Sequence, residues 1–508
     1  MKPLTVSTRS ITYLEFKSLF KGPTRVSLTK DSINNIKRSH HRLKLKLKEG
    51  STIYGVNTGF GNLSHIKIDK KDLEKLQINL ARSHASGVGE PLQLGIVRSV
   101  LYLKLLTFAK GYSGVRLEVA QKIIQFLNND ILPVIPQKGS VGASGDLNPL
   151  GHMTLCLIGE GEVFYKNKRI STSIALKKAR IKPLILKPKE GLSLINGTQV
   201  STAIAIKALI DGDSLLKTAD IAGAISVENS FSSRKVFHKK VHQIKAHPGQ
   251  KISAKNIYAM LIGSEIVRSH NNCGKVQDPY SFRCIPHIHG ACRDTFSHAV
   301  EMVNNEINSV SDNPIILHNG NVVNSGHFHA EHIAQAMDHL SIAFSELGAV
   351  SERRVHYFMK GIENRIPPFV TLSPGIESGY MMSHVTATAL VSENKTLSHP
   401  ASIDSLSTSG GQEDLVSMAP WAAYKLLNIQ NNLSVILGIE LIVAGAANHI
   451  ASPDLNPGKG TAPILKQLKK YCFYDKGDRS LNPEIDSVSQ QVQSGKLLEI
   501  ISNFIGLE

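Results

Sequence analysis

Residues 139–152 read Gly-Ser-Val-Gly-Ala-Ser-Gly-Asp-Leu-Asn-Pro-Leu-Gly-His and form the most informative stretch of the chain. The first seven residues contain three glycines and two serines. Glycine adopts the positive φ values of tight turns without the penalty that a Cβ imposes. Asp146 is a favourable N-cap, and a helix tolerates Pro149 in its first turn. The stretch therefore predicts a tight turn that leads into the N-terminus of a helix.

The Ala143-Ser144-Gly145 tripeptide inside this turn can also become a reactive group. If the turn presses the Gly145 nitrogen against the Ala143 carbonyl, attack closes a five-membered ring, and loss of the Ser144 hydroxyl leaves an exocyclic methylidene. Glycine is needed because a side chain would block the approach. The product, 4-methylideneimidazol-5-one (MIO), is an electrophile, and a helix N-terminus beside it would stabilise negative charge on the ring. The alternative is an ordinary serine-rich turn that caps a helix.

The run from Gly139 to His152 resembles the electrophile-forming signature of the aromatic amino acid ammonia-lyases, and similar motifs follow in the same order from about Tyr54 to Met418. This resemblance implies a carbon–nitrogen lyase that forms MIO autocatalytically from Ala143, Ser144 and Gly145 and needs no external cofactor. It also implies a homotetramer whose active sites are shared between subunits.

Long helical patterns with few prolines dominate the second part of the chain, roughly at 198–228, 292–309, 327–359, 380–395 and 420–450. So many long helices predict a bundle. We therefore expect a mainly α fold, a long-helix bundle of the ammonia-lyase (fumarase/aspartase-like) architecture. The predicted regions are 1–197, which is loop-rich and carries the MIO turn, and 198–508, which forms the bundle; together they make one catalytic unit.

Two motifs of the first region supply further candidates. Tyr54 begins the glycine-rich loop 54–61, whose spacing fits neither a P-loop nor a dinucleotide fingerprint. The resemblance places Tyr54 in the active site, where it would handle the proton at the departing amine. Asn196-Gly197 is by itself an ordinary turn, and the resemblance implies that Asn196 hydrogen-bonds near the electrophile and the substrate amine.

The stretch 277–283 predicts a helix start, with Asp278 as N-cap and Pro279 at the first helical position. Tyr280 and Arg283 would then lie on neighbouring parts of one helix face. Without the resemblance this is a capped helix with a surface arginine. The resemblance makes Tyr280 the base that removes the β-proton and Arg283 the clamp for the substrate carboxylate. Gln277 becomes a polar support.

The substrate follows from two positions that the resemblance assigns to the aromatic ring. The Ser83-His84 pair looks like the histidine-specific form, although some tyrosine-specific relatives carry it too. Glu413 points the same way, because a carboxylate suits an imidazole and is wasted on a phenyl ring. We expect L-histidine to be converted to trans-urocanate, the first step of histidine degradation. The alternative is a tyrosine or phenylalanine ammonia-lyase or aminomutase, and sequence leaves open whether the substrate's amine or its ring engages the electrophile.

Phe328 matches the position beside the electrophile, whereas His327 and Leu415 depart from the family's pattern. His327, His329, Glu331 and His332 also invite a metal interpretation. Residues two apart on one helix face different ways, so their side chains share a metal ion poorly. We expect no metal site.

The chain has 58 Lys and Arg against 41 Asp and Glu, a formal net charge of +17. Such a surplus can attract nucleic acid or an anionic membrane. The lysines are spread along the chain, and only 6% of residues are aromatic. We interpret the charge as a solvated surface with no nucleic-acid or membrane partner; a non-catalytic basic binding protein is the remote alternative.

The cysteines are odd in number and include no CxxC pair: Cys156, Cys273, Cys284, Cys292 and Cys472. This set favours reduced thiols over a disulfide framework. Residues 1–19 are interrupted by charges and lack the apolar core of a signal peptide. The most apolar stretch, 433–447, carries Glu440 and is too short to span a bilayer. We expect a soluble, cytoplasmic protein.

Overall fold

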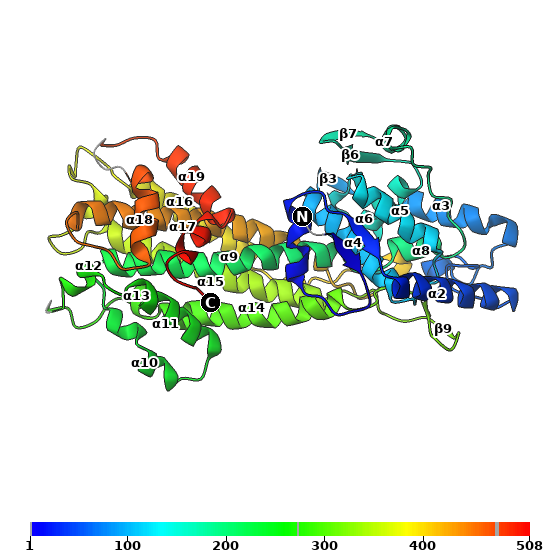
Figure 1. Ribbon diagram of the computed structural model, residues 1–508, viewed down its shortest axis with the longest axis horizontal. Helices are drawn as coiled ribbons and strands as arrows, with labels where there is room; N and C mark the ends of the chain where they lie inside the picture. Colours follow the sequence, from blue (N-terminus) through cyan, green and yellow to red (C-terminus); the bar gives the residue numbers. More distant parts are fainter. Residues whose placement is uncertain (1–2, 272–273, 473–476) are drawn as a thin grey trace. The chain divides into compact units, whose positions relative to one another are not determined.

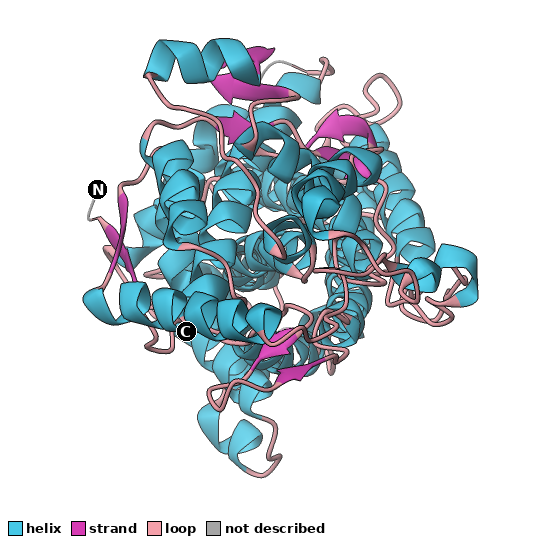
Figure 2. Cartoon of the chain, turned by 90° about the vertical axis from the view of Figure 1, so that its right-hand side faces the viewer, coloured by secondary structure: helices cyan, strands magenta, loops and turns pink. Residues whose placement is uncertain are grey.

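The computed structural model describes residues 3–271, 274–472 and 477–508, and Figure 1 labels its elements. Helices make up 60% of the chain, and the strands are few and short (Figure 2). The mainly α fold class is therefore confirmed.

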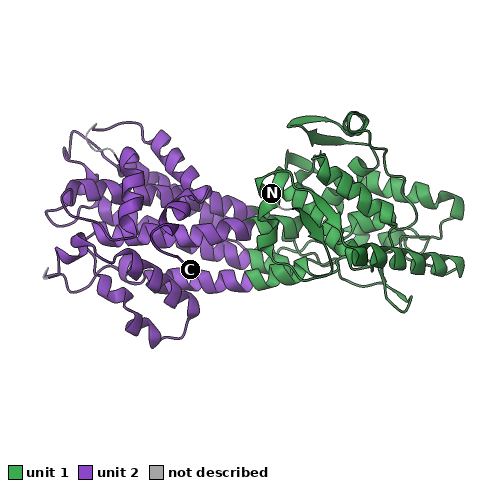
Figure 3. Cartoon of the chain, in the orientation of Figure 1, with its two compact units in different colours: residues 1–207, 300–337, 400–424 green, residues 208–299, 338–399, 425–508 purple. Residues whose placement is uncertain are grey.

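The chain forms two compact units, each built from three segments (Figure 3). Unit 1 comprises residues 1–207, 300–337 and 400–424, and unit 2 comprises 208–299, 338–399 and 425–508. The units are discontinuous in sequence, whereas the regions 1–197 and 198–508 are continuous, and that division stays a prediction.

Unit 1 is built from short strands and helices, with η denoting 3₁₀ helices. In chain order these are β1 (Leu4–Val6), η1 (Tyr13–Phe16), α1 (Lys17–Lys21), β2 (Val26–Leu28), α2 (Lys30–Lys48), η2 (Gly61–Leu63), η3 (Lys70–Asp72), α3 (Leu73–His84), β3 (Val88–Pro91), α4 (Leu94–Ala109), α5 (Leu117–Asn128), β4 (Leu132–Pro133), β5 (Pro136–Lys138), α6 (Leu147–Leu157), β6 (Glu162–Tyr165), β7 (Lys168–Ser171), α7 (Thr172–Ala179), α8 (Glu190–Ile195), β8 (Ile315–Ile316), β9 (Val322–Val323) and η6 (Ser409–Gly411).

The strands of unit 1 pair locally. β1 and β2 are parallel, β3 pairs antiparallel with β5, β4–β6–β7 form an antiparallel sheet, and β8 pairs antiparallel with β9. Helix α4 forms the centre of the unit, since every residue from Gly95 to Ala109 is buried. Helices α3, α6 and α8 pack against one another. These three helices carry or adjoin most of the predicted site residues of the unit.

Unit 2 contains shorter helices around long ones. The shorter ones are η4 (Arg234–Phe237), α10 (Lys239–Gln243), α11 (Pro248–Met260), α12 (Glu265–Arg268), α13 (Tyr280–Arg283), η5 (Pro368–Val370), α16 (Met381–Leu397), α18 (Thr461–Leu468), η7 (Lys469–Tyr471), α19 (Asn482–Gln493) and α20 (Lys496–Ser502). Four long helices contribute residues to both units: α9 (Gln199–Asn229), α14 (Ile285–Ile307), α15 (Glu331–Met359) and α17 (Ala419–Ala451).

The predicted long helices are confirmed, with two shifted starts. Helix α14 begins at Ile285, seven residues before the predicted start at 292. Helix α15 begins at Glu331 rather than at 327. The preceding residues form a turn in which the His329 amide donates to the Gly326 carbonyl at 2.9 Å. His327 and His329 are therefore outside the helix on which the metal interpretation placed them.

The apolar stretch 433–447 lies within α17, whose 33 residues are long and apolar enough to cross a membrane by length and composition. The expectation that this segment is too short was wrong, because the helix extends well beyond its most apolar part. However, 78% of the apolar 18-residue segment within this helix is buried inside the protein. Helix α17 is therefore a core helix.

Glu440 of α17 is a fully buried carboxylate in unit 2. The Arg354 guanidinium, also fully buried, donates through Nη2 to Glu440 Oε2 at 2.8 Å. The Ser226 hydroxyl donates to Glu440 Oε1 at 2.6 Å. These partners satisfy a charge that would otherwise be costly in an apolar core.

The described cysteines, Cys156, Cys284, Cys292 and Cys472, carry free thiols. Burial raises the pKa of Cys156, Cys292 and Cys472 to about 12. These three thiols are therefore protonated at neutral pH. Cys273 lies outside the described residues.

Replacing Glu440 by glutamine tests the buried ion pair of unit 2. Glu440→Gln leaves the Arg354 charge buried without a counter-ion, so we expect the free energy of unfolding to fall by about 3 kcal/mol or more. Urea unfolding at fixed protein concentration measures the change. Glu499→Gln, at an exposed pair with Lys496 in the same unit, is the control and should leave the midpoint unchanged. Equal midpoints for the two variants would contradict the assignment.

Candidate active site

The predicted turn lies between β5 and α6 of unit 1, and helix α6 begins at Leu147 as expected. Gly142 and Gly145 adopt φ values of +68° and +74°, a conformation that side chains disfavour. The turn is also tied to a distant segment, since the Met418 amide donates to the Val141 carbonyl at 2.8 Å and the Ser417 hydroxyl donates to the Gly142 carbonyl at 3.1 Å. The segment just before residues 143–145 is thus anchored to residues 417 and 418.

Asp146 occupies the N-cap position of α6, but its side chain does not cap that helix. Its carboxylate instead accepts from the Val200 and Ser201 amides, each at 2.8 Å, at the start of α9. The expectation that Asp146 caps the helix after the turn was therefore wrong for the side chain. Burial raises the pKa of Asp146 to about 6, against the lowering effect of these hydrogen bonds.

Gly145 is pressed against the backbone of Gly197. A Cβ on Gly145 would lie 2.2 Å from the Gly197 carbonyl oxygen, so no other residue fits there without a shift. The same carbonyl accepts from the Asp146 amide at 2.8 Å. A glycine at 145, with no side chain to hinder its nitrogen, together with a serine at 144 whose hydroxyl can be lost, fits the MIO group.

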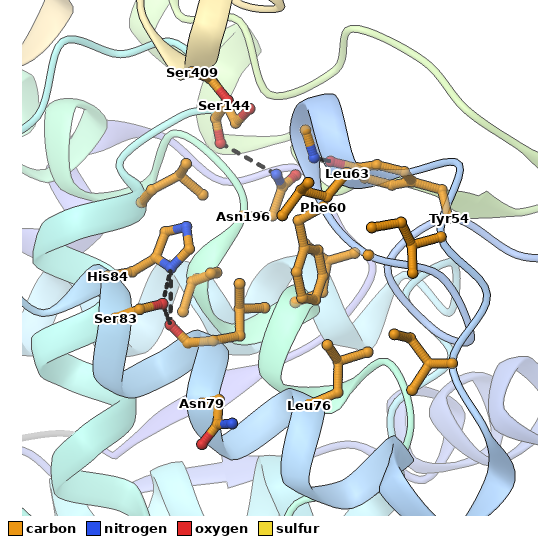
Figure 4. A pocket seen from close by; sticks show the side chains of 18 of the residues that line it. Tyr54, Phe60, Leu63, Leu76, Asn79, Ser83, His84, Ser144, Asn196 and Ser409 are labelled. Carbon is orange, nitrogen blue, oxygen red and sulfur yellow. Dashed lines mark hydrogen bonds between the residues drawn. The ribbon is translucent and has the colours of Figure 1, made fainter.

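A cavity opens directly in front of Ser144 in two adjoining lobes. The first lobe, of about 600 Å³, is mostly apolar and includes Phe60, Leu76 and His84 (Figure 4). The second lobe, of about 430 Å³, is more polar and includes Ala143, Asn313, Phe328, His329 and Leu415. Both lobes share Tyr54, Gly61, Ser144, Asn196 and Glu413. Unit 1 therefore brings together eight of the predicted site residues: Tyr54, His84, Ala143, Ser144, Gly145, Asn196, Phe328 and Glu413.

His84 ends helix α3 and presents one ring nitrogen to the apolar lobe (Figure 4). Its Nδ1 lies 2.8 Å from the Leu80 carbonyl oxygen. A carbonyl can only accept, so Nδ1 carries the proton and Nε2 is left as an acceptor in the neutral ring. Burial lowers the pKa of His84 below its ordinary value, which favours this neutral form.

Glu413 lines both lobes of the cavity. Its Oε1 accepts from the Ser144 hydroxyl at 2.8 Å and its Oε2 accepts from the Thr408 hydroxyl at 2.7 Å. Thr408 was not among the predicted residues. A threonine five positions before Glu413 carries no sequence signal, and its role depends on the loop that folds it back onto Glu413.

Asn196 and Tyr54 complete the centre of the cavity. The Asn196 Nδ2 donates to the Ser144 carbonyl at 3.2 Å. Its Oδ1 is buried and has no hydrogen-bond partner among the described residues. The Gly61 amide donates to the Tyr54 hydroxyl oxygen at 3.0 Å, so the Tyr54 hydroxyl proton remains free to be donated. Phe60, in the same loop, packs edge-on against the Tyr54 ring, with 6.3 Å between the ring centroids.

Gln277, Tyr280 and Arg283 belong to unit 2. Helix α13 begins at Tyr280, and the Arg283 guanidinium lies 4.7 Å from the centre of the Tyr280 ring. Tyr280 is 68% exposed. Asp278 is not the predicted N-cap, because Pro279 occupies that position. The Asp278 carboxylate instead accepts from the Ser233 amide at 2.7 Å and pairs with Lys275.

The segment that carries His327, His329, Glu331 and His332 shows no ligand geometry. Among the residues that the structure describes, no group of three or more His, Cys, Asp or Glu side chains could hold a metal ion. His329 Nε2 instead lies 3.3 Å from the Leu415 carbonyl oxygen. Leu415, a departure from the family's pattern, is largely exposed in the polar lobe.

The chain is similar to curated proteins over nearly its whole length. It is 41% identical over 488 residues to the histidine ammonia-lyase of Myxococcus xanthus and 43% identical over 490 residues to that of Burkholderia multivorans, with 96% of each chain covered in both pairs.

Solved structures with the same fold include the histidine ammonia-lyase from Trypanosoma cruzi, with a TM-score of 0.91, 32% identity and coverage of 99% of this chain and 96% of that one. The tyrosine aminomutase from Streptomyces globisporus has a TM-score of 0.94 at 31% identity and is covered completely. A family profile described as aromatic amino acid lyase matches residues 11–470. The chain belongs to the aromatic amino acid lyase family.

Proposed function

We propose that this enzyme is a histidine ammonia-lyase, which eliminates ammonia from L-histidine to give trans-urocanate. The observation that carries the proposal is the pair of hydrogen-bond acceptors, His84 Nε2 and the Glu413 carboxylate, that line one cavity with Ser144. The relatives named above support the same substrate. A neutral imidazole offers one N–H donor to such an acceptor, and an imidazolium offers two, whereas a phenyl ring offers none.

Ala143, Ser144 and Gly145 would form MIO, which supplies an electrophilic carbon and accepts electrons during elimination. The chain's own groups bind and orient the substrate around it. Asn196 Oδ1 accepts an N–H of the substrate amine, which satisfies an oxygen that is otherwise buried without a partner. Tyr54 moves the proton at the departing amine, since its hydroxyl proton is free.

Tyr280 would remove the β-proton, and Arg283 would bind the substrate carboxylate in a charge-assisted pair. The stacking of the Arg283 guanidinium on the Tyr280 ring keeps the two groups together on the surface of unit 2. Gln277 would support the carboxylate site, and Phe328 would pack beside the ring of residues 143–145.

We further propose that the enzyme is a cytoplasmic homotetramer in which each active site takes residues from more than one subunit. The exposure of Tyr280 supports this assembly, because a second subunit would cover that side chain and enclose the base together with the substrate. Closed symmetry would then bury the same surface on every subunit.

A related activity on tyrosine, either elimination or amino-group migration, is the second candidate. It is favoured by the mostly apolar lobe beside His84, since a tyrosine hydroxyl can donate to His84 Nε2. Turnover on L-histidine, L-tyrosine and L-phenylalanine separates the candidates. Aminomutase activity would appear as a β-amino acid product.

Intact-mass measurement tests the origin of the electrophile. The wild-type chain should be two water molecules lighter than its encoded mass, whereas Ser144→Ala, which has no hydroxyl to lose, should be at most one water lighter and release no ammonia from L-histidine. Ser173→Ala, at the exposed start of α7, is the control and should lose both waters. Deamination by Ser144→Ala at the wild-type rate would refute the proposed chemistry.

Glu413→Gln tests the contribution of the carboxylate to substrate choice. Loss of a charge-assisted hydrogen bond should lower kcat/KM for L-histidine by an amount equivalent to about 1.5–3 kcal/mol. The values for tyrosine and phenylalanine should fall much less. Asp404→Asn, on an exposed carboxylate of the same segment, controls for the change in charge. An equal fall in kcat/KM for all three amino acids would show that Glu413 does not discriminate between their side-chain rings.

Subunit mixing tests the shared sites. Ser144→Ala and Tyr280→Phe should each be inactive alone, but co-expressed chains should recover activity because about a quarter of the sites in random mixtures combine two native residues. Each homogeneous variant and the wild type, assayed for ammonia release at equal concentration, are the references. No recovery in tetramers shown by native mass spectrometry to be mixed would mean that each site is built within one subunit.

A further inference from the structure

Lys104 is a buried lysine near the middle of α4, and its side chain is fully inaccessible to solvent. Its Nζ donates to the Ser193 carbonyl at 3.0 Å and to the Asn196 carbonyl at 2.7 Å. These carbonyls lie at the C-terminal end of α8, where a helix leaves its last carbonyls without internal partners. Lys104 therefore ties the end of α8, and the turn that follows it, to the central helix of unit 1.

The turn at residues 193–197, which Lys104 holds, packs directly against residues 143–145. The Asn196 side chain donates to the Ser144 carbonyl at 3.2 Å. Gly197 is the residue against which Gly145 is pressed, and its carbonyl accepts from the Asp146 amide at 2.8 Å. A shift of the 193–197 turn would thus move both the amide that faces the substrate and the wall that crowds Gly145.

A second buried lysine, Lys189, lies nearby but has different hydrogen-bond partners from Lys104. Lys189 Nζ donates to the Ser193 hydroxyl at 2.7 Å and lies 3.4 Å from both carboxylate oxygens of Asp312. It makes a conventional ion pair and does not bind the Asn196 carbonyl. The two described hydrogen bonds of Lys104 go to main-chain carbonyls, so removal of its side chain would act on the backbone of the turn.

Burial lowers the pKa of Lys104 to about 7. Burial therefore penalises its charged form, and this penalty offsets part of the stabilisation from its two hydrogen bonds. A methionine of similar length would fill the same space without that penalty. The effect of the lysine that methionine cannot reproduce is the position of the two carbonyls.

We propose that Lys104 is a positioning residue of the active site, which holds the 193–197 turn so that Asn196 faces Ser144 and Gly197 presses on Gly145. The inference rests on the proposed ammonia-lyase function. It predicts that Lys104 influences both the self-modification of residues 143–145 and the turnover of substrate, without contact to the imidazole ring.

Lys104→Met, Lys104→Arg and Lys122→Met form the test set. Lys122 is a matched control, because it is also a buried lysine of unit 1 that donates to a main-chain carbonyl, that of Lys182 at 2.5 Å. For each variant we would measure the thermal midpoint, the fraction of chains lighter by two waters, and kcat and KM with L-histidine.

Lys104→Met should reduce the fraction of cyclised chains and lower kcat by about tenfold or more. KM should change by less than about threefold, because of the substrate contacts only that of Asn196 is displaced while those of His84 and Glu413 remain. Lys104→Arg, which can still donate to both carbonyls, should restore cyclisation and most of kcat. Lys122→Met should at most lower the thermal midpoint and should leave the cyclised fraction, kcat and KM unchanged. If Lys104→Met does not fold, Lys104→Gln, which keeps one N–H donor group, carries the same readouts.

A cooperatively folded Lys104→Met with complete cyclisation and wild-type kcat would overturn the inference. So would equal losses of kcat in Lys104→Met and Lys122→Met that simply follow the fall in midpoint. A wild-type chain that is cyclised but releases no ammonia from L-histidine would instead refute the proposed substrate, and the mass readout would still decide whether Lys104 positions the turn.

Discussion

The contact between Gly145 and Gly197 is the constraint on which the site depends. The two backbones approach each other very closely. A Cβ added to Gly145 would collide with Gly197, and a Cβ added to Gly197 would lie 2.1 Å from the Ser311 carbonyl oxygen. Because protein interiors are close-packed, such contacts persist only when the surrounding elements hold them. Here the holding groups include the Lys104 and Ser417 side chains and the Met418 amide, all from distant parts of the sequence. The turn is therefore shaped by tertiary structure rather than by its own composition.

Three helices that pack against one another position the binding residues around this contact. Helix α3 ends at His84, α6 begins just after residues 143–145, and α8 ends at Ile195 with Asn196 as its C-cap. Their mutual packing places one residue from each neighbourhood around a single cavity. Sites built on helix ends benefit twice, because the scaffold is rigid and the helix termini offer unpaired backbone groups.

Much of this arrangement could be predicted from the sequence. Long apolar patterns located the main helices, and the motifs around Tyr54, His84, Asn196 and Glu413 identified groups that do meet in one cavity. The errors concern contacts between distant residues. Asp146 caps α9 rather than α6, and Asp278 binds the Ser233 amide rather than capping its own helix. A capping residue can be recognised locally, but the amide that it caps depends on which helix end the fold brings near.

Other features had no sequence signal at all. Thr408 and Lys104 are ordinary residues in a loop and in an apolar helix, and their partners lie 5 and about 90 positions away. The start of α15 was misplaced because a turn closed by Gly326 precedes it. Periodicity describes the faces of helices, whereas hydrogen bonds between segments have no period to detect.

The hydrogen bond between the Ser144 hydroxyl and Glu413 imposes an order of events on the proposed enzyme. While that hydroxyl is present, one oxygen of the carboxylate already has a donor from its own chain. In the proposed enzyme, this hydroxyl would leave as water when residues 143–145 cyclise. The Glu413 oxygen would then be free to accept a hydrogen bond from the substrate.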